Sequence, residues 1–345
     1  MPELTTQRLG QAEQHIFALE RNPAPVAPAD RAARLIDPGF GRVFTDHMAM
    51  IRYSEAKGWH DARITARGPL QMDPASSVLH YAQEIFEGMK AYHLADGGTA
   101  LFRPEANARR FQNSARRMAM PELPEHLFLE SVRALVKTDQ DWIPSGDQGA
   151  LYLRPFMFAS EVFLGVKPSA EYLYLVIASA VGAYFKGGAP SVSLWVSQEY
   201  TRAAPGGTGD TKCGGNYAAS LLAQSEAIRR GCDQVVFLDA VERKWIEELG
   251  GMKSSSCSRM DRWSHRRWAA RSCLASRAIR SCNWRGTRAL SCARSHIRST
   301  VGGQMQPAVG LPKASPAAPL PSSRQSAASP ARKVPLRSVG VGRGR

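Results

Sequence analysis

One lysine in this sequence is placed where it could do covalent chemistry. Lys212 lies in the stretch GDTKCGGNYAAS, residues 209–220, among small residues, and Tyr217 follows five positions later. A lysine amine can attack an aldehyde to form a C=N bond, and small neighbours leave room for the aldehyde to approach. Gly214 and Gly215 carry no Cβ, so they would let the backbone come close to a bound molecule. Taken alone, the stretch is also typical of a surface turn with a solvated lysine.

Charged residues elsewhere could bind an anion or hold a proton. Arginines lie in and just after the segment LFRPEANARRF, residues 101–111, and their guanidinium groups offer paired donors to phosphate oxygens. These arginines are Arg103, Arg109, Arg110, Arg116 and Arg117. The segment WIEELGGM, residues 245–252, contains two adjacent acids, Glu247 and Glu248. In a strand their side chains point to opposite faces, so only one of them can face a site.

Hydrophobic spacing predicts the elements that must position these residues. Pro104 suits a first helical turn, and the apolar residues behind it recur at helical spacing, which predicts a helix over 104–120. A second such pattern predicts a helix over 124–142. Apolar runs predict strands over 150–160, 172–185 and 191–200, and a helix over 217–231 precedes a strand, turn and strand over 233–249. Lys212 is thus expected in the loop before a helix.

The charge of the chain is concentrated at one end. The formal net charge is +15 for 345 residues, but residues 253–345 carry 19 Lys and Arg and a single acid, Asp261. Residues 1–252 therefore hold 26 bases and 29 acids, a net of −3. The segment 253–345 also lacks Phe, Tyr and any apolar periodicity. None of the six cysteines forms a CxxC pair or has histidines at ligand spacing, so no metal site is expected.

Five motifs in one order resemble the branched-chain amino acid aminotransferases, which are pyridoxal-phosphate enzymes of the D-alanine-aminotransferase-like fold. The resemblance runs from about residue 40 to Met252. The motifs are VLHYAQEIFEGMKAY (78–92), LFRPEANARRF (101–111), LYLRPF (151–156), VGAYF (181–185) and the lysine region from Arg202 to Asp239. Because all five stand in the family's order and spacing, the surface-turn interpretation of Lys212 is disfavoured.

The resemblance implies a role for each charged candidate. Lys212 resembles the lysine that binds pyridoxal 5'-phosphate covalently and moves the substrate proton, and Tyr217 resembles the tyrosine that hydrogen-bonds the phenolic oxygen of the cofactor. The pattern FRxxxNxxR selects Arg110 as the phosphate anchor. Spacing to the methionine selects Glu248, rather than Glu247, as the carboxylate that pairs with the pyridine nitrogen and keeps it protonated.

The resemblance also implies a substrate pocket and a partner subunit. The pocket residues would be Tyr81, Phe86, Tyr152, Arg154 and Tyr184. Aromatic walls suit a branched aliphatic side chain, and an arginine would help admit glutamate. Without the resemblance, these aromatic residues would be interpreted as ordinary core. The stretch Leu164-Gly165-Val166 resembles a loop that reaches the partner's pocket, which implies a homodimer.

The expected fold is α+β, of the D-alanine-aminotransferase-like type, also called fold type IV. We expect an N-terminal arm at 1–40, a small α/β domain at 41–185, an interdomain loop at 186–192, the first half of a large β-barrel-like domain at 193–252, and a disordered, low-complexity basic tail at 253–345. In the family the motif LGGM continues differently, and a later phosphate-binding loop and Gly-Thr motif do not occur here.

Three interpretations of residues 253–345 remain. They could be a basic tail that binds nucleic acid, a small disulfide-linked module, or the out-of-frame translation of a GC-rich gene. Three tryptophans and four cysteines are unusual in a basic tail, and a reducing compartment disfavours disulfides. The third interpretation is favoured because the change of composition falls inside a family motif.

The sequence thus predicts amino-group transfer between Leu, Ile or Val and 2-oxoglutarate, although this chain is expected to be essentially inactive as written. The alternatives are a D-amino acid transaminase or aminodeoxychorismate lyase of the same fold, or a non-catalytic, basic-tailed binding protein. The most apolar run, residues 172–185, is too short to span a bilayer, and no secretory signal is visible at the N-terminus. A cytoplasmic enzyme with no membrane or nucleic-acid partner is therefore expected.

Overall fold

A computed structural model describes residues 16–94, 96–145, 149–182 and 193–250, together with the backbone of the short strands at 6–8, 256–257 and 263–264. All of these lie within one compact unit, Met1–Val301. The glycine-rich segment 186–190, Tyr184 and the composition change after Met252 fall outside the described ranges, so the expectations placed on them are not addressed.

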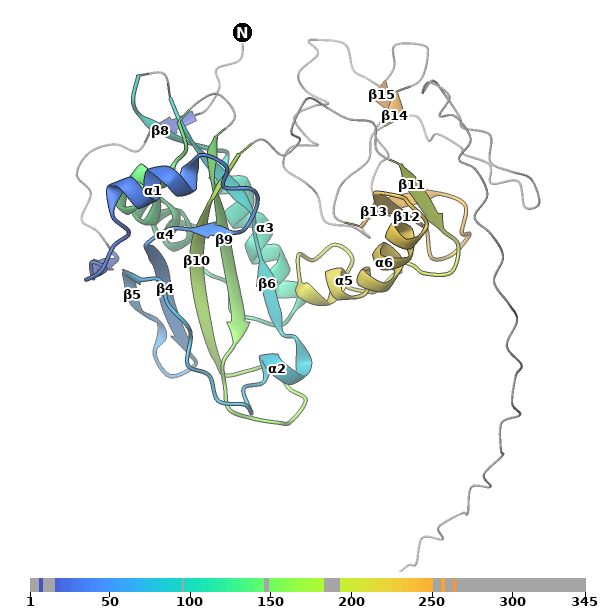
Figure 1. Cartoon of the computed structure of the whole chain (residues 1–345). Helices are drawn as coiled ribbons and strands as arrows, with labels where there is room; N and C mark the ends of the chain where they lie inside the picture. Colours follow the sequence, from blue (N-terminus) through green and yellow to red (C-terminus); the bar gives the residue numbers. More distant parts are fainter. Residues whose placement is uncertain are drawn as a thin grey trace, which may run out of the picture. The chain divides into compact units, whose positions relative to one another are not determined.

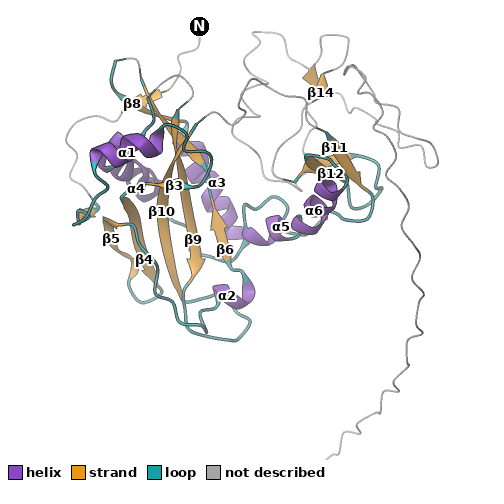
Figure 2. Cartoon of the chain, viewed as in Figure 1, coloured by secondary structure: helices purple, strands orange, loops and turns teal. Residues whose placement is uncertain are grey.

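A mixed, mainly antiparallel sheet forms the larger part of the described structure (Figures 1 and 2). Within the described residues ten strands join it, in the order β1-β8-β7-β9-β10-β4-β5-β2, with β3 paired to β10 and β6 to β9. The strands are β1 Thr6–Arg8, β2 Ala18–Leu19, β3 Val43–Phe44, β4 His47–Ser54, β5 Gly58–Ala66, β6 Glu84–Phe86, β7 Met89–His93, β8 Thr99–Phe102, β9 Ala150–Ala159 and β10 Glu171–Val181.

Apolar residues are buried on both faces of the sheet. Along the central strands, successive apolar residues belong alternately to one face and to the other. Along β10, Tyr172 and Tyr174 enter the main core, whereas Leu173 and Leu175 enter a smaller cluster on the other face. This period of two follows from the pleat of a strand. A strand that is apolar on both faces reads as a continuous apolar run, which is why the run at 172–185 was recognisable as a buried strand.

Helices α3 (Pro104–Arg117) and α4 (Glu125–Thr138) pack together and against this sheet (Figure 1). Helix α3 begins at Pro104, whose fixed φ suits a first turn, and its buried face includes Ala108, Phe111 and Ala115. These residues were predicted to face inward, and they contribute to the main core. The remaining elements of this part are α1 Pro28–Leu35, α2 Val78–Tyr81 and a 3-10 turn at Gln140–Trp142.

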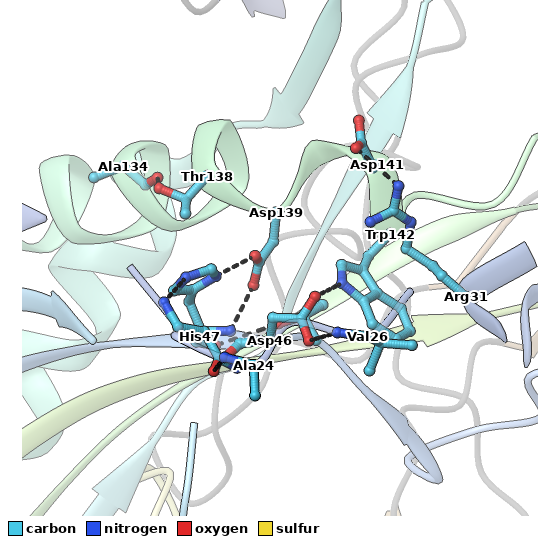
Figure 3. Close-up of polar contacts among 12 residues, drawn as sticks. Ala24, Val26, Arg31, Asp46, His47, Ala134, Thr138, Asp139, Asp141 and Trp142 are labelled. Carbon is cyan, nitrogen blue, oxygen red and sulfur yellow. Dashed lines mark hydrogen bonds and ion pairs between the residues drawn. The ribbon is translucent and has the colours of Figure 1, made fainter. Parts of the chain in front are cut away.

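The described part of the N-terminal arm is attached to the sheet. Phe17 is 2% exposed and belongs to the main core, and β2 pairs in parallel with β5. The Asp46 carboxylate accepts hydrogen bonds from the Val26 backbone N–H and from the Trp142 indole N–H at 3.0 and 2.8 Å (Figure 3). Composition favoured a loop, but it could not predict partners that lie 20 and 96 residues away.

A buried histidine and aspartate extend the same network (Figure 3). Asp139 accepts a hydrogen bond from the His47 backbone N–H at 3.0 Å, and its second carboxylate oxygen lies 2.7 Å from Nδ1 of the His47 ring. The Asn22 backbone N–H donates to Nε2 of the same ring at 2.9 Å. Because Nε2 accepts, Nδ1 carries the proton and donates it to Asp139. One carboxylate therefore orders the ring that fastens the N-terminal arm.

Asp139→Ala is expected to lower the free energy of unfolding by about 2–4 kcal/mol, because it leaves two buried donors of His47 without an acceptor. Urea unfolding followed by tryptophan fluorescence measures this loss. Asp141→Ala is the control, because the Asp141 side chain is 64% exposed and pairs with Arg31 at the surface. It should cost less than about 1 kcal/mol. Equal losses for the two variants would contradict the structural role assigned to Asp139.

Residues 193–250 form a second, smaller assembly. Strands β11 (Leu194–Ser197) and β12 (Gln234–Leu238) are parallel, β13 (Ile246–Leu249) is antiparallel to β12, and α6 (Leu221–Arg229) packs against β11 and β12 (Figure 1). The helix predicted over 217–231 is in fact two helices, since α5 (Gly214–Ala218) ends before α6 begins. Gly231 follows α6 with a φ of +74°, a left-handed conformation that glycine adopts without strain. Strands β14 (Ser256–Cys257) and β15 (Trp263–Ser264) pair antiparallel.

Candidate active site

The backbone of Lys212 is held by the large sheet and by helix α3. Its carbonyl accepts a hydrogen bond from the Phe86 backbone N–H at 2.9 Å, and its own N–H donates to the Ser114 hydroxyl at 3.0 Å. Phe86 is the last residue of β6, and Ser114 is a buried residue of α3. Strand β6 and helix α3, both far from Lys212 in the sequence, therefore fix the position of the Lys212 backbone.

The loop before Lys212 is tied together by an amide and an arginine. The Asn216 side chain donates to the carbonyls of Thr208 and Thr211 at 2.6 and 2.8 Å, and it accepts from the Thr208 hydroxyl at 2.7 Å. Arg117, from α3, donates to the carbonyls of Gly206 and Gly207 at 3.0 and 3.1 Å. These hydrogen bonds restrain the loop, so the loop can hold Lys212 in one orientation.

The Lys212 side chain meets one hydroxyl and two aromatic rings. Nζ donates to the Tyr217 hydroxyl at 2.8 Å, and it lies 4.4 Å from the Phe86 ring centroid and 5.1 Å from that of Tyr217. The two rings are 4.9 Å apart. The predicted lysine and tyrosine are thus in direct contact. The amine is half-buried and has a hydroxyl partner, and its role as a nucleophile stays a prediction.

Two more of the predicted pocket residues join this group through Phe86. The Arg154 guanidinium carbon lies 4.7 Å from the Phe86 centroid and 5.4 Å from that of Tyr152, and Nη2 donates to the Tyr152 hydroxyl at 2.9 Å. The buried Nε of Arg154 has no hydrogen-bond acceptor. Lys212, Tyr217, Phe86, Arg154 and Tyr152 therefore form a continuous cluster, referred to below as the lysine cluster.

Glu84 lies beside this cluster and close to Gly214. Burial raises the pKa of the Glu84 carboxyl, and the positive charge of Arg154 works in the opposite direction. A Cβ at Gly214 would overlap the Glu84 carboxylate, whereas one at Gly215 would meet nothing within 4 Å. A larger residue at position 214 would therefore require the flexible Glu84 side chain to move. The expectation that both glycines admit a cofactor ring stays a prediction.

Arg110 binds a buried acid that the sequence interpretation did not single out. Its Nε and Nη2 donate to the two carboxylate oxygens of Glu87 at 2.5 and 2.6 Å, and the Glu87 side chain is fully buried. The Asn107 amide donates to the same carboxylate at 2.7 Å. Glu87 directly follows Phe86, so the Arg110 group adjoins the lysine cluster. The sequence did contain a signal, because Glu87 stands in the apolar stretch EIFEGM. A carboxylate buried there needs a cation or hydrogen-bond donors beside it.

The remaining predicted residues lie as follows. Glu248 is 7% exposed and pairs with Phe237 across β12 and β13, while the neighbouring Glu247 is partly exposed. Tyr81 ends the short helix α2, is 40% exposed, and donates to the Leu164 carbonyl. The loop that contains Leu164 exposes several apolar residues, among them Val166 at 88%. The roles assigned to all of these residues stay predictions.

Metal-ligating clusters, disulfides and membrane-spanning helices were sought in the described ranges. Within them, no three side chains of His, Cys, Asp and Glu gather as a metal site would require, and neither Cys213 nor Cys232 forms a disulfide. No helix in the part of the chain that the structure describes is long and apolar enough to cross a membrane.

Comparison with known proteins places this site in a family. Residues 84–244 match the family described as Amino-transferase class IV. A probable branched-chain-amino-acid aminotransferase of Streptomyces coelicolor is 60% identical over 235 residues, which cover 68% of this chain and 65% of that protein. The branched-chain-amino-acid aminotransferase of Mycolicibacterium smegmatis is 58% identical over 237 residues, which cover 68% of this chain and 64% of that protein. The chain thus spans just under two thirds of the length of these relatives.

The fold agrees with the same assignment. The crystal structure of a branched-chain amino acid aminotransferase from Thermobaculum terrenum, in its PLP form, superposes with a TM-score of 0.55 at 20% identity, covering 68% of this chain and 71% of that chain. At this identity the likeness concerns the fold alone, and it confirms the expected α+β, fold type IV architecture. The match spans the strand and helix that hold Phe86 and Arg110 as well as the loop that holds Lys212. Residues 84–244 are thus similar to the class IV aminotransferases in both sequence and fold.

Proposed function

We propose that this chain carries the N-terminal part of a branched-chain-amino-acid aminotransferase that uses pyridoxal 5'-phosphate to transfer the amino group between Leu, Ile or Val and 2-oxoglutarate. The observation that supports it best is the contact of Lys212 with Tyr217, 2.8 Å apart and flanked by Phe86. This pair combines a nucleophilic amine with a hydroxyl, inside a region that matches class IV aminotransferases. The names of the relatives favour branched-chain substrates over D-amino acids or aminodeoxychorismate.

The chemistry of the residues present suits the cofactor, because they offer an amine beside a hydroxyl, a buried carboxylate, and a guanidinium whose Nη1 is not directed at Glu87. Lys212 would hold its aldehyde carbon, Tyr217 its phenolic oxygen, Arg110 its phosphate and Glu248 its ring nitrogen. The bound cofactor supplies an electron-accepting ring for the chemistry at the substrate α-carbon. The protein's own contribution is to place the Lys212 amine, which, once the substrate amine has displaced it from the cofactor, would take the proton from the substrate α-carbon and deliver it to the carbon that Lys212 had held. Tyr217 orients that amine through the hydrogen bond already present, and buried Glu248 supplies negative charge.

The aromatic residues of the cluster suit an aliphatic substrate. Phe86 and Tyr152 offer ring surface beside the amine, and burying a Leu or Ile side chain there would contribute roughly 1.5–3 kcal/mol. The Arg154 guanidinium contacts both rings, and its positive charge would also favour the acidic end of glutamate. Tyr81 and Tyr184 would complete the pocket. The branched-chain amino acid and glutamate would thus bind in the same site.

The assembly and compartment are proposed on separate grounds. The exposed apolar loop around Leu164 and Val166, at 59% and 88% exposure, is suited to cover a partner's pocket, which supports a homodimer. The unpaired cysteines Cys213 and Cys232 suit the cytoplasm, where thiols stay reduced. We further propose that residues 253–345 derive from a frameshift, because their charge and composition differ from the preceding 252 residues.

Expression of two forms tests the function. A chain whose reading frame is restored after Met252 is expected to transaminate Leu, Ile and Val with 2-oxoglutarate, measured as glutamate formed. The chain as written should show essentially no turnover, because it matches its relatives over only 64–65% of their length. Sequencing the gene around codon 252 gives an independent check. If the restored form acts on D-alanine and not on leucine, the proposed substrate class is wrong.

A further inference from the structure

One side of helix α3 faces the loop that carries Lys212. Arg110, Ser114 and Arg117 stand four and three residues apart, so their side chains leave the helix on the same side. The Ser114 hydroxyl accepts a hydrogen bond from the Lys212 backbone N–H at 3.0 Å, and Arg110 is held beside the lysine cluster by Glu87. Arg117, the third member of this row, does not belong to the lysine cluster, so its contacts need a separate explanation.

Arg117 binds a segment that is far away in the sequence. Its Nη2 donates to the carbonyls of Gly206 and Gly207 at 3.0 and 3.1 Å. Both carbonyls lie in residues 203–212, which end at Lys212 and are referred to below as the lysine loop. Arg117 therefore joins the end of α3 to the loop that presents the reactive amine.

The lysine loop depends on contacts of this kind for its order. It forms neither helix nor strand, so no regular hydrogen-bond pattern holds its backbone. Gly206 has a φ of +76°, and a glycine without such contacts has many other conformations available. The guanidinium of Arg117 restricts the loop at this point, and the Asn216 amide restricts it again at Thr211, the residue before Lys212. The restraint thus runs from α3 to the lysine itself.

We propose that Arg117 is a positioning residue for Lys212, because it holds the lysine loop against α3 and so keeps the Lys212 amine beside Tyr217 while an aldehyde binds. In the attachment, the amine nitrogen forms a C=N bond to the aldehyde carbon, and the aldehyde oxygen leaves as water with the two amine hydrogens. A loop that samples other arrangements presents the amine correctly for only part of the time, and the rate of attachment falls in proportion. The aldehyde rests on the proposed function, but the order of the loop does not.

Hydrogen exchange of the ligand-free, full-length chain tests the ordering of the loop. Arg117→Met removes the donors, so the amides of the lysine loop, including that of Lys212, should exchange about tenfold faster than in the wild type. Because Arg117 is exposed, the melting temperature should change by less than about 2 °C. Arg116→Met is the matched control. Arg116 is the neighbouring residue of the same helix but donates to Glu122 at 2.6 Å, so its loss should leave exchange in the lysine loop unchanged.

Trapping of pyridoxal phosphate tests the effect on the lysine. Each form of the chain is mixed with the aldehyde for increasing times, borohydride stops the reaction, and peptide mapping measures the label on Lys212. Arg117→Met should label Lys212 about tenfold more slowly than the wild type, and Arg116→Met should label it at the wild-type rate. Arg117→Lys keeps a charged donor, so it should recover part of the rate, and it keeps the test usable if Arg117→Met does not fold.

The two measurements together decide the proposal. Faster exchange without slower labelling, or an Arg117→Met variant that matches Arg116→Met in both measurements, would show that Arg117 does not position Lys212. A wild type that never labels Lys212 would instead contradict the proposed function. In that case the exchange of the lysine loop alone decides whether Arg117 holds it.

Discussion

Lys212→Ala is expected to abolish covalent attachment of pyridoxal phosphate. In the wild type, borohydride reduction with one equivalent of the aldehyde should place the pyridoxyl group on Lys212. The reason is geometric, because its amine is held 2.8 Å from a hydroxyl and 4.4 Å from the centroid of an aromatic ring that can flank a planar ligand. Preorganised contacts of this kind make one amine react ahead of others. Peptide mapping by mass spectrometry measures the labelled position.

The control for this experiment is Lys167→Ala. Lys167 is also near an aromatic ring, at 4.8 Å from the Phe163 centroid, but its amine forms an ion pair with Glu161 at 2.8 Å and its side chain is 43% exposed. Its removal should leave the label on Lys212 unchanged. A label that moves to Lys167, or that persists in full in Lys212→Ala, would show that proximity to an aromatic ring is not what selects the reactive lysine.

The regular elements around the site could be predicted from local sequence. The helix predicted over 104–120 is α3, Pro104–Arg117, and the strand predicted over 150–160 is β9, Ala150–Ala159. In both cases the element was predicted from the spacing of its apolar residues and from a proline or glycine at its boundary. The direct contact of Lys212 with Tyr217 was not predicted from local sequence, because the family resemblance only assigned the two residues to the same cofactor.

Contacts between distant segments could not be predicted in the same way. Glu87 and Arg110 are 23 residues apart, and His47 and Asp139 are 92 apart. No local period connects such pairs, because they meet only after the sheet has assembled. The division of the predicted helix at 217–231 into α5 and α6 was missed for a different reason. Ser220, which stands at the N-cap of α6, was the available signal, because serine favours helix starts over helix interiors.

Glu87→Ala is expected to lower the free energy of unfolding by about 3–5 kcal/mol, the usual cost of leaving a buried charge unpaired. The carboxylate is fully buried and accepts two hydrogen bonds from Arg110, one from the Asn107 amide and one from the Gly88 backbone N–H. Each of these donors would lose this acceptor at once. Urea unfolding of the full-length chain measures the loss. Glu87→Gln keeps the shape but not the charge, so it should cost less than alanine does.

A second ion pair of this protein isolates burial as the cause. Arg116 donates from Nε to Glu122 at 2.6 Å, a distance close to that between Arg110 and Glu87, but its two side chains are 58% and 41% exposed. Water competes for exposed charges, so Glu122→Ala should cost less than about 1 kcal/mol. Distance alone would predict equal losses for the two variants. If Glu87→Ala costs no more than Glu122→Ala, Arg110 does not depend on Glu87, and another group must hold its guanidinium beside the lysine cluster.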